Sequence, residues 1–91
     1  MNIRFSWDEA KRLSNIADHG FDFMDVPAVF VGSTMTFEDD RFDYGEQRFV
    51  TLGFLREAAV SVVHTETEIE IQVISFRKAT RRESRLLHES I

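Results

Sequence analysis

The sequence predicts an α+β protein in which helices pack on an antiparallel sheet of about four strands, in the order β-α-α-β-β-β-β-α. Three apolar, β-branched runs, at 47–55, 58–66 and 69–76, are separated by two residues each, which is typical of an antiparallel meander. Two segments with helix-capping residues precede these runs, and a third follows them. Because 91 residues leave no room for two cores, we expect residues 1–91 to form a single domain.

The first predicted helix follows a short strand candidate, IRFSW. Asp8 is placed to cap this helix, which runs to about His19 and stops at Gly20. The apolar periodicity predicts a buried stripe, with Ile16 on its flank, that consists of Ala10, Leu13 and Ala17. The opposite and solvated face is expected to carry the residues at i, i+4 and i+8, namely Lys11, Asn15 and His19.

A second helical segment and another strand follow. Asp22 is positioned to cap FMDVPAVFV, where Pro27 is expected to shorten or bend the helix because it has no N–H to donate. The next run, TMTFED, is a strand candidate. It leads into DDRFDYGEQ at residues 39–47, which reads as a polar loop rich in Asp.

The three strands of the meander differ in how clearly their faces can be read. In the last strand Ile69, Ile71 and Val73 alternate with polar residues, which predicts one buried and one open face. The middle strand, AAVSVVHTE, alternates poorly. Its pattern therefore leaves the face of His64 undetermined.

The closing segment is predicted to be a helix that begins with a capping box. Thr80 and Glu83 have the T-x-x-E spacing of that motif, which makes Arg81 and Arg82 the first two helical residues. Leu86 and Leu87 are expected to pack inward. An outward stripe is expected to consist of Arg81, Arg85 and His88.

Composition excludes several classes of protein. A chain that is 43% hydrophobic and 30% charged is typical of a soluble globular domain. The absence of Cys excludes a disulfide framework and a thiolate metal site. The longest apolar run, VPAVFV, is too short to cross a bilayer, and MNIRFSWDEA lacks the apolar core of a signal peptide. We therefore expect a cytoplasmic protein with no membrane association.

Charge is distributed unevenly along the chain. Residues 1–74 hold six Lys or Arg against 14 Asp or Glu, whereas residues 75–91 hold five against two. Arg81 and Arg82 lie in a first helical turn, where the helix dipole disfavours cations. Either an anion such as phosphate binds there, or internal carboxylates pair with these arginines. For any single Arg, an ion pair with a carboxylate of the same chain is the simpler explanation. Five cations in nine residues, taken together, favour an anion site.

The three histidines do not predict a metal site. They show no ligand-like spacing with each other or with a carboxylate cluster, so no metal or other cofactor is expected. His19 next to Gly20 reads as a residue that complements the helix end, while His64 fits a structural and a site role equally well. Phosphate-binding glycine loops and nucleophile motifs are absent.

Four blocks of the sequence resemble, in the same order, those of the BrnT toxins: FSWDEAKRLSNIADHGFDF, RFVTLG, VVHTE and VISFRKATRRE. The resemblance covers nearly the whole chain. BrnT proteins are small RelE-like ribonucleases, the toxin halves of bacterial type II toxin–antitoxin pairs, so the resemblance implies a RelE-like fold. It also implies a BrnA-like antitoxin partner with a ribbon-helix-helix DNA-binding domain. The complex would contact operator DNA only through that antitoxin and would repress its own operon.

The resemblance further implies RNA cleavage without a metal, by attack of the ribose 2′-OH on the neighbouring phosphate. Such a reaction needs a base, an acid and cations on the phosphorane oxygens. Carried over by position, the implied catalytic residues are Arg77, Lys78, Arg81, His64 and His19. The implied RNA-binding residues are Lys11, Arg82, Arg85 and Gln72.

Three positions depart from the family pattern. Asp18 stands where Lys is usual, Gln72 where Arg is common, and Leu87 where a Tyr that could stack on a base is frequent. Each departure removes a cation or a stacking surface from the expected RNA side. Two functions stay open: an active endoribonuclease toxin, and a catalytically weak module that binds the antitoxin and acts mainly in autorepression. A stand-alone DNA-binding regulator fits less well, because no helix-turn-helix is evident and most of the chain is acidic.

Overall fold

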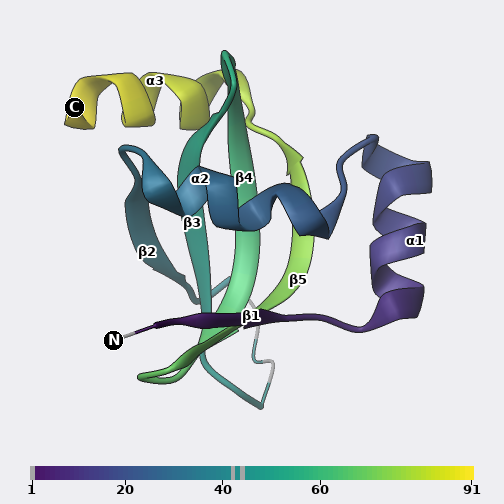
Figure 1. Ribbon diagram of the computed structural model, residues 1–91. Coiled ribbons are helices and arrows are strands. Elements are labelled where there is room, and N and C mark those ends of the chain that lie inside the picture. Colours follow the sequence, from purple (N-terminus) through teal and green to yellow (C-terminus); the bar gives the residue numbers. More distant parts are fainter. Residues whose placement is uncertain (1, 42, 44) are drawn as a thin grey trace.

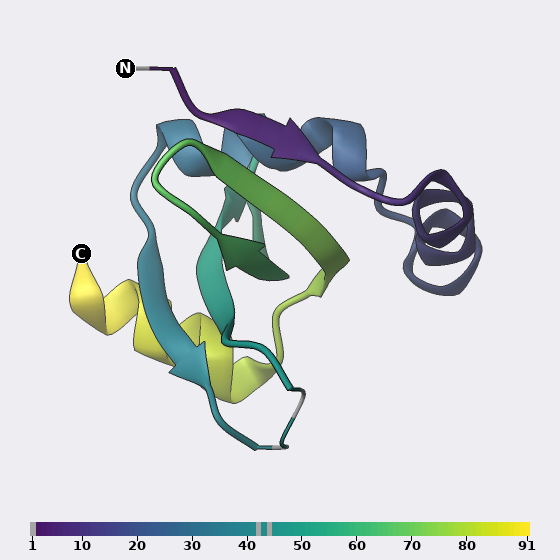
Figure 2. The same cartoon turned by 90° about the horizontal axis from the view of Figure 1, so that it is seen from below.

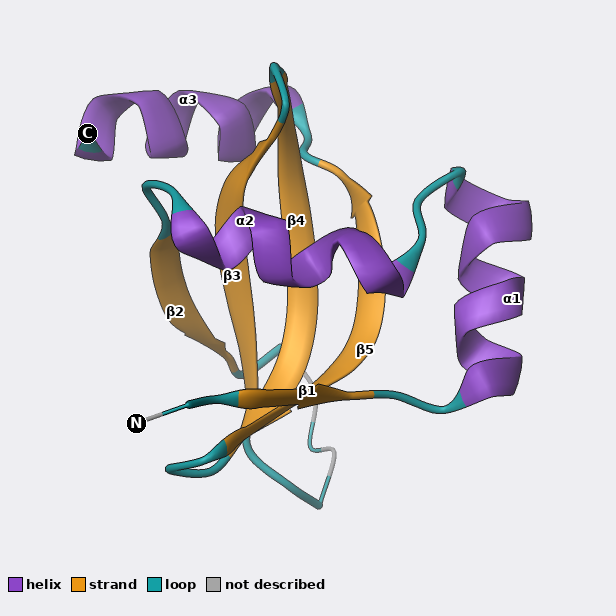
Figure 3. Cartoon of the chain, viewed as in Figure 1, coloured by secondary structure: helices purple, strands orange, loops and turns teal. Residues whose placement is uncertain are grey.

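A computed structural model describes residues 2–41, 43 and 45–91, and it confirms the α+β class and the predicted order of elements (Figures 1 and 3). Residues 42 and 44 of the predicted polar loop lie outside the described residues. The helical elements are α1 (Glu9–His19), the 3₁₀ turn η1 (Phe23–Asp25), α2 (Val26–Val31) and α3 (Arg81–Ser90). The strands are β1 (Arg4–Ser6), β2 (Met35–Asp39), β3 (Arg48–Leu55), β4 (Ala58–Glu66) and β5 (Glu70–Lys78).

The sheet of the described chain has five strands in the order β1-β5-β4-β3-β2. Strands β3 to β5 form the predicted antiparallel meander, and β2 extends it by pairing antiparallel to β3. The expectation of about four antiparallel strands needs one correction, because β1 adds to the edge of β5 in parallel and makes the sheet mixed. This pairing runs only from Arg4 opposite Glu70 to Ser6 opposite Gln72, so the outer edge of β5 beyond Gln72 is left for another element.

Helices cover both faces of the sheet. The core on one face joins η1 and α2 to β3, β4 and β5 through Phe23, Val26, Val29, Leu55, Val60, Val62, Val73 and Phe76. The core on the other face is smaller and joins α3 to β3 and β4 through Val50, Leu52, Val63 and Leu87. Figure 2 shows α2 and α3 on opposite sides of the sheet. We refer to these two sides as the α2 face and the α3 face.

Helix α1 has the predicted ends but does not bury the predicted face. Asp8 accepts from the Lys11 N–H at the start, and Gly20 takes the left-handed conformation at the end. The expected stripe is wrong, because the following side chains are exposed: Ala10, Leu13, Ile16 and Ala17. The buried residue is Asn15, which was expected in solvent.

Asn15 is buried because α1 lies beside the open edge of β5 (Figure 1). Its side-chain oxygen accepts from the Phe76 N–H at 3.0 Å, and its side-chain N–H₂ donates to the Phe76 carbonyl at 2.7 Å. The same group also donates to the Phe21 carbonyl at 2.9 Å. One amide thus satisfies the backbone polar groups that a neighbouring strand would otherwise pair, and it fastens α1 to the sheet.

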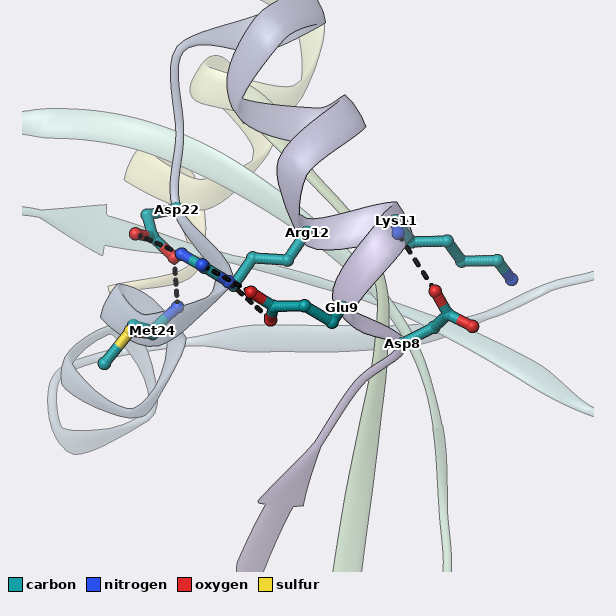
Figure 4. A network of polar contacts seen from close by, with 6 residues as sticks. All are labelled: Asp8, Glu9, Lys11, Arg12, Asp22 and Met24. Atoms are coloured by element: carbon teal, nitrogen blue, oxygen red, sulfur yellow. Dashed lines mark hydrogen bonds and ion pairs between the residues drawn. The ribbon is translucent and has the colours of Figure 1, made fainter.

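The junction between α1 and η1 is fixed by ion pairs around Arg12 (Figure 4). Its guanidinium donates to Glu9 at 2.6 and 2.8 Å and to Asp22 at 3.0 Å. Asp22 also accepts from the Met24 N–H and so caps η1, as predicted. These contacts raise the pKa of Arg12, while the Arg12 hydrogen bonds lower the pKa of Glu9. The Met24 N–H, followed by Arg12, lowers the pKa of Asp22.

The second helical segment is interrupted near Pro27, as expected. It divides into η1 and the short α2, with Pro27 in the first turn of α2, where a backbone N–H has no helical acceptor. Helix α2 lies so close to β3 that a Cβ built on Gly53 would come within 2.6 Å of Val29 Cγ1. Glycine at position 53 therefore permits the close approach of α2 to the sheet.

Candidate functional site

The basic segment at residues 77–85 joins the end of β5 to the first turns of α3. The predicted capping box is present, since Thr80 Oγ1 accepts from the Glu83 N–H at 3.1 Å and Glu83 Oε1 accepts from the Thr80 N–H at 2.9 Å. Helix α3 therefore begins at Arg81 as predicted. Leu87 is fully buried as expected, whereas Leu86 is 38% exposed and packs inward only in part.

Arg77 is held in place by Glu83. The guanidinium makes a two-point ion pair with the Glu83 carboxylate at 2.8 and 3.0 Å and also donates to the Lys78 carbonyl. The hydrogen bond from Arg77 is the main cause that lowers the pKa of Glu83. For Arg77, the alternative prediction that an internal carboxylate pairs with the arginine is therefore confirmed. Its Nε makes no hydrogen bond within the described residues, so the fixed guanidinium keeps a donor for a ligand.

The other four cations of the segment are Lys78, Arg81, Arg82 and Arg85. All four are exposed, and within the described part of the chain no carboxylate lies at ion-pair distance from any of them. Lys78 and Arg81 line a hollow of about 360 Å³ together with Thr80 and Ser84 at the start of α3. The geometry leaves these four side chains available to an anion.

Arg77 shares a cavity with a second arginine, which was not predicted as a site residue from the sequence. A cavity of about 220 Å³ on the α3 face is lined by both Arg77 and Arg41, with Phe37 and Val50 as apolar parts of its wall. Arg41 donates through Nε at 2.8 Å to Asp39, whose side chain is buried. Arg41 lies in the polar loop, far from the basic segment in sequence and outside every block that resembles BrnT, so no pattern marked it.

Lys11 and His19 are brought together on the opposite flank of β5. They line a cavity of about 300 Å³ between α1 and the strand residues Ile74 and Ser75. Ser75 lies two residues from Arg77 on the same strand. Asp18 lines the same cavity, so this departure from the family pattern lies beside Lys11 and His19.

His64 lies away from this surface. Its ring is fully buried on the α2 face between Phe30 and Phe49, and its Nε2 is 2.8 Å from Thr51 Oγ1. Arg77 is on the α3 face, bonded to Glu83 of that helix. Burial lowers the pKa of His64, so its neutral form is favoured. The sheet separates His64 from Arg77, and this position argues against a role for His64 in proton transfer beside Arg77.

Two further positions named in the sequence analysis lie away from the exposed basic segment. Gln72 is exposed but lies near the other end of β5, beside Thr65 and Glu66, about 16 Å from Arg77 along the strand. Leu87 is part of the core under α3, so its departure from the family pattern removes no stacking surface from the RNA side. In the described ranges no three His, Asp or Glu side chains gather in a way that could hold a metal ion. None of the described helices is long and apolar enough to cross a membrane.

Comparisons with known proteins agree with the fold and the sequence blocks. A family model described as "Ribonuclease toxin, BrnT, of type II toxin-antitoxin system" matches residues 7–83. The 1.1 Å crystal structure of the Brucella abortus ribonuclease toxin BrnT superposes with a TM-score of 0.72 at 29% sequence identity. The match covers 88% of this chain and 100% of that one. A search of curated proteins gives no significant match.

Proposed function

Since the chain belongs to the BrnT family of ribonuclease toxins of type II toxin–antitoxin systems, we propose that it is a metal-independent endoribonuclease that cleaves RNA by attack of a ribose 2′-OH on the adjacent phosphate. Cleavage in the cytoplasm would inhibit translation and growth. A type II toxin has a cognate antitoxin, and we propose a BrnA-like protein with a ribbon-helix-helix domain for that role.

The observation that carries this proposal is the state of the basic segment. Arg77 is fixed by Glu83, and four more cations beside it have no carboxylate partner within the described residues. Negative charge develops on the phosphorane oxygens during 2′-OH attack, and fixed guanidinium donors stabilise such charge because they need not reorganise. The exposed cations can contact the flanking phosphates.

Proton transfer is assigned to His19 rather than to His64. His19 is exposed and shares a cavity with Lys11, next to the part of β5 that leads to Arg77. An imidazole titrates near neutral pH and therefore serves as either base or acid in such a reaction. Lys11 would contact an RNA phosphate on the same flank.

Neutralisation would follow if the antitoxin covers the basic segment. Acidic side chains of the antitoxin would pair with the exposed cations, and the complex would contact operator DNA only through the antitoxin. Raised salt would weaken this charged part of the interface. A structure of the inactive complex would test this form of inhibition. It would be contradicted if the antitoxin left Arg77, Arg81 and Arg82 open to RNA.

Purified protein incubated with RNA in EDTA tests the reaction. We expect cleavage to persist, with products that carry a 2′,3′-cyclic phosphate and a 5′-hydroxyl, because no metal-ligand cluster is present in the described residues. Loss of cleavage in EDTA that Mg²⁺ restores would contradict the mechanism.

A second candidate function is favoured by the burial of His64, which leaves one of the two predicted proton-transfer groups away from Arg77. Under that alternative the protein is a weak nuclease that acts mainly as an antitoxin-binding module in autorepression. Expression of the chain alone in a bacterial host separates the two functions. Growth arrest with loss of RNA supports the nuclease, and normal growth with tight binding of the antitoxin supports the module.

A further inference from the structure

The cavity on the α3 face brings together two arginines from distant parts of the sequence. Arg77 comes from the end of β5, and Arg41 comes from the loop after β2. Each is oriented by a carboxylate: Glu83 binds Arg77 at 2.8 and 3.0 Å, and Asp39 binds Arg41 at 2.8 and 3.1 Å. The two ion pairs therefore line one cavity of about 220 Å³.

Both carboxylates are well placed to fix their arginines. The Asp39 side chain is 1% exposed and the Glu83 side chain 18% exposed, while their partners Arg41 and Arg77 are 61% and 28% exposed. Each ion pair therefore joins a sheltered carboxylate to a guanidinium that a ligand can reach. Glu83 is also bound by the capping box of α3. A guanidinium held in this way loses little conformational freedom when it binds an anion, and its planar donors match the oxygen atoms of a phosphate.

We propose that Arg41 is a second phosphate-binding arginine and that it holds, together with Arg77, one phosphodiester of the RNA chain in this cavity. The proposal rests on the ribonuclease function above and adds a residue to its site. Phe37 and Val50 form an apolar part of the cavity wall, where a ribose or base attached to that phosphate would lie.

The residues that line the cavity include two arginines and four carboxylates. Asp39 and Glu83 are each engaged by an arginine, while the other two carboxylates, Glu38 and Asp40, are exposed and screened by solvent. The exposed cations of α3 are not among the lining residues and add positive charge beside them. These cations attract RNA, and the two arginines of the cavity would contact one of its phosphates.

The test uses the full chain and a 2′-O-methyl oligoribonucleotide, which keeps the phosphates and lacks the attacking hydroxyl. Arg41→Gln should weaken binding about tenfold, which corresponds to about 1.4 kcal/mol, and should reduce the slope of log affinity against log salt by about 0.7. The matched control is Arg4→Gln, which removes the same charge from an exposed arginine on β1, at the far edge of the sheet. Its binding and salt slope should stay close to those of the wild type.

Removal of Arg41 alone leaves Asp39 buried without this partner, so the double variant Asp39→Asn with Arg41→Gln is measured as well. Thermal melts establish that each variant is folded. The double variant should show the same loss of affinity and the same shallower salt slope. Arg41 variants that are folded and bind like Arg4→Gln would overturn the proposal.

Cleavage of unmodified RNA keeps this proposal separate from the ribonuclease function. Wild-type cleavage with unchanged binding by Arg41→Gln would leave the nuclease in place and remove Arg41 from its site. Oligonucleotide binding that depends on Arg41, without any cleavage by the wild type, would support the phosphate site and contradict the nuclease. A wild type that neither binds nor cleaves would overturn both.

Discussion

Arg77 differs from the four cations that follow it, although all five were predicted as one group. Its guanidinium is committed to Glu83, while Lys78, Arg81, Arg82 and Arg85 are exposed. Sequence spacing showed the density of charge but not this division, because the pairing depends on how the chain turns from β5 into α3. A fixed arginine beside exposed cations is a suitable arrangement for one phosphate at the reacting position and others along the RNA.

At the start of α3, activity and stability should respond in opposite ways. Arg81→Ala or Arg82→Ala removes an unfavourable charge from the first helical turn and raises helix propensity, so unfolding free energy should stay unchanged or rise by roughly 0.5 kcal/mol. RNA cleavage should fall about tenfold or more, as expected for one lost charge-assisted contact. Thr80→Ala should instead lower stability by about 1 kcal/mol through loss of the cap and affect cleavage less. Thermal melts and a cleavage assay measure both effects. Arginine variants that melt earlier and cut RNA normally would show that these arginines are structural.

His64 should make stability depend on pH near neutrality. Burial lowers the pKa of His64 in the folded protein, so below pH 6.5 the unfolded chain takes up a proton that the folded protein does not. The free energy of unfolding should therefore not be reduced by this group above pH 6.5. It should fall as the pH drops below 6.5, by no more than about 1.4 kcal/mol per pH unit for one proton. The carboxylates of Glu83, Glu9 and Asp22 have lowered pKa values and titrate in more acidic solution.

Urea denaturation at pH 7.5 and 5.5 measures this dependence, and His64→Gln provides the comparison, since it retains His19 and His88. The wild type should lose stability between the two pH values, and the variant should lose clearly less. An equal loss in both proteins would mean that His64 is not the group responsible.

At the scale of elements, the sequence predicted which segments are helices and strands better than it predicted which faces they bury. Helix α1 has the predicted caps at Asp8 and Gly20, because capping depends on neighbouring residues alone. Its buried face depends on β5, where a strand edge requires a polar partner rather than an apolar stripe. The periodicity of Ala10, Leu13 and Ala17 contained no information about that edge.

Asn15 is expected to contribute more to stability than any exposed residue of α1. Asn15→Leu removes the partners of the Phe76 N–H and carbonyl and should lower the free energy of unfolding by about 2–4 kcal/mol, since a buried backbone group without a partner costs about 1–3 kcal/mol. Urea denaturation measures the loss. Ser14→Ala on the exposed side of α1 is the control and should change stability by less than about 0.5 kcal/mol. If the two variants are equally stable, the amide does not fasten α1 to the sheet.

At the scale of the whole molecule, the meander, the order of elements and the family blocks were all readable from the sequence, because each depends on local pattern. The candidate site was readable only in part. The basic segment and the pair Lys11 and His19 could be found from charge and spacing. Arg41 could not, because its loop and the end of β5 line one cavity only once the sheet has assembled. The face of His64 could not be predicted, because β4 is apolar on both faces and its pattern does not reveal which side a residue takes.

The molecule has an acidic body and a basic edge, and this separation of charge favours the approach of RNA from one side. Net charge is −5, yet the α3 end of the sheet carries the five cations of residues 77–85. We therefore expect an RNA strand to approach the protein from this basic end of the sheet. The central claim is that cleavage takes place on the α3 face, with Arg77 as the fixed guanidinium at the reacting phosphate.

The most direct test is the single-turnover rate of RNA cleavage by the double variant Arg77→Gln with Glu83→Gln. Gln at position 83 can still form the capping box, and the double change leaves no carboxylate without its arginine, so the fold should be retained in thermal melts. We expect the rate to fall on the order of 10²-fold, as for loss of one preorganised donor to a developing oxyanion, while the control Arg4→Gln cuts at the wild-type rate. A folded double variant that cleaves RNA as fast as the wild type would contradict the assignment of the site.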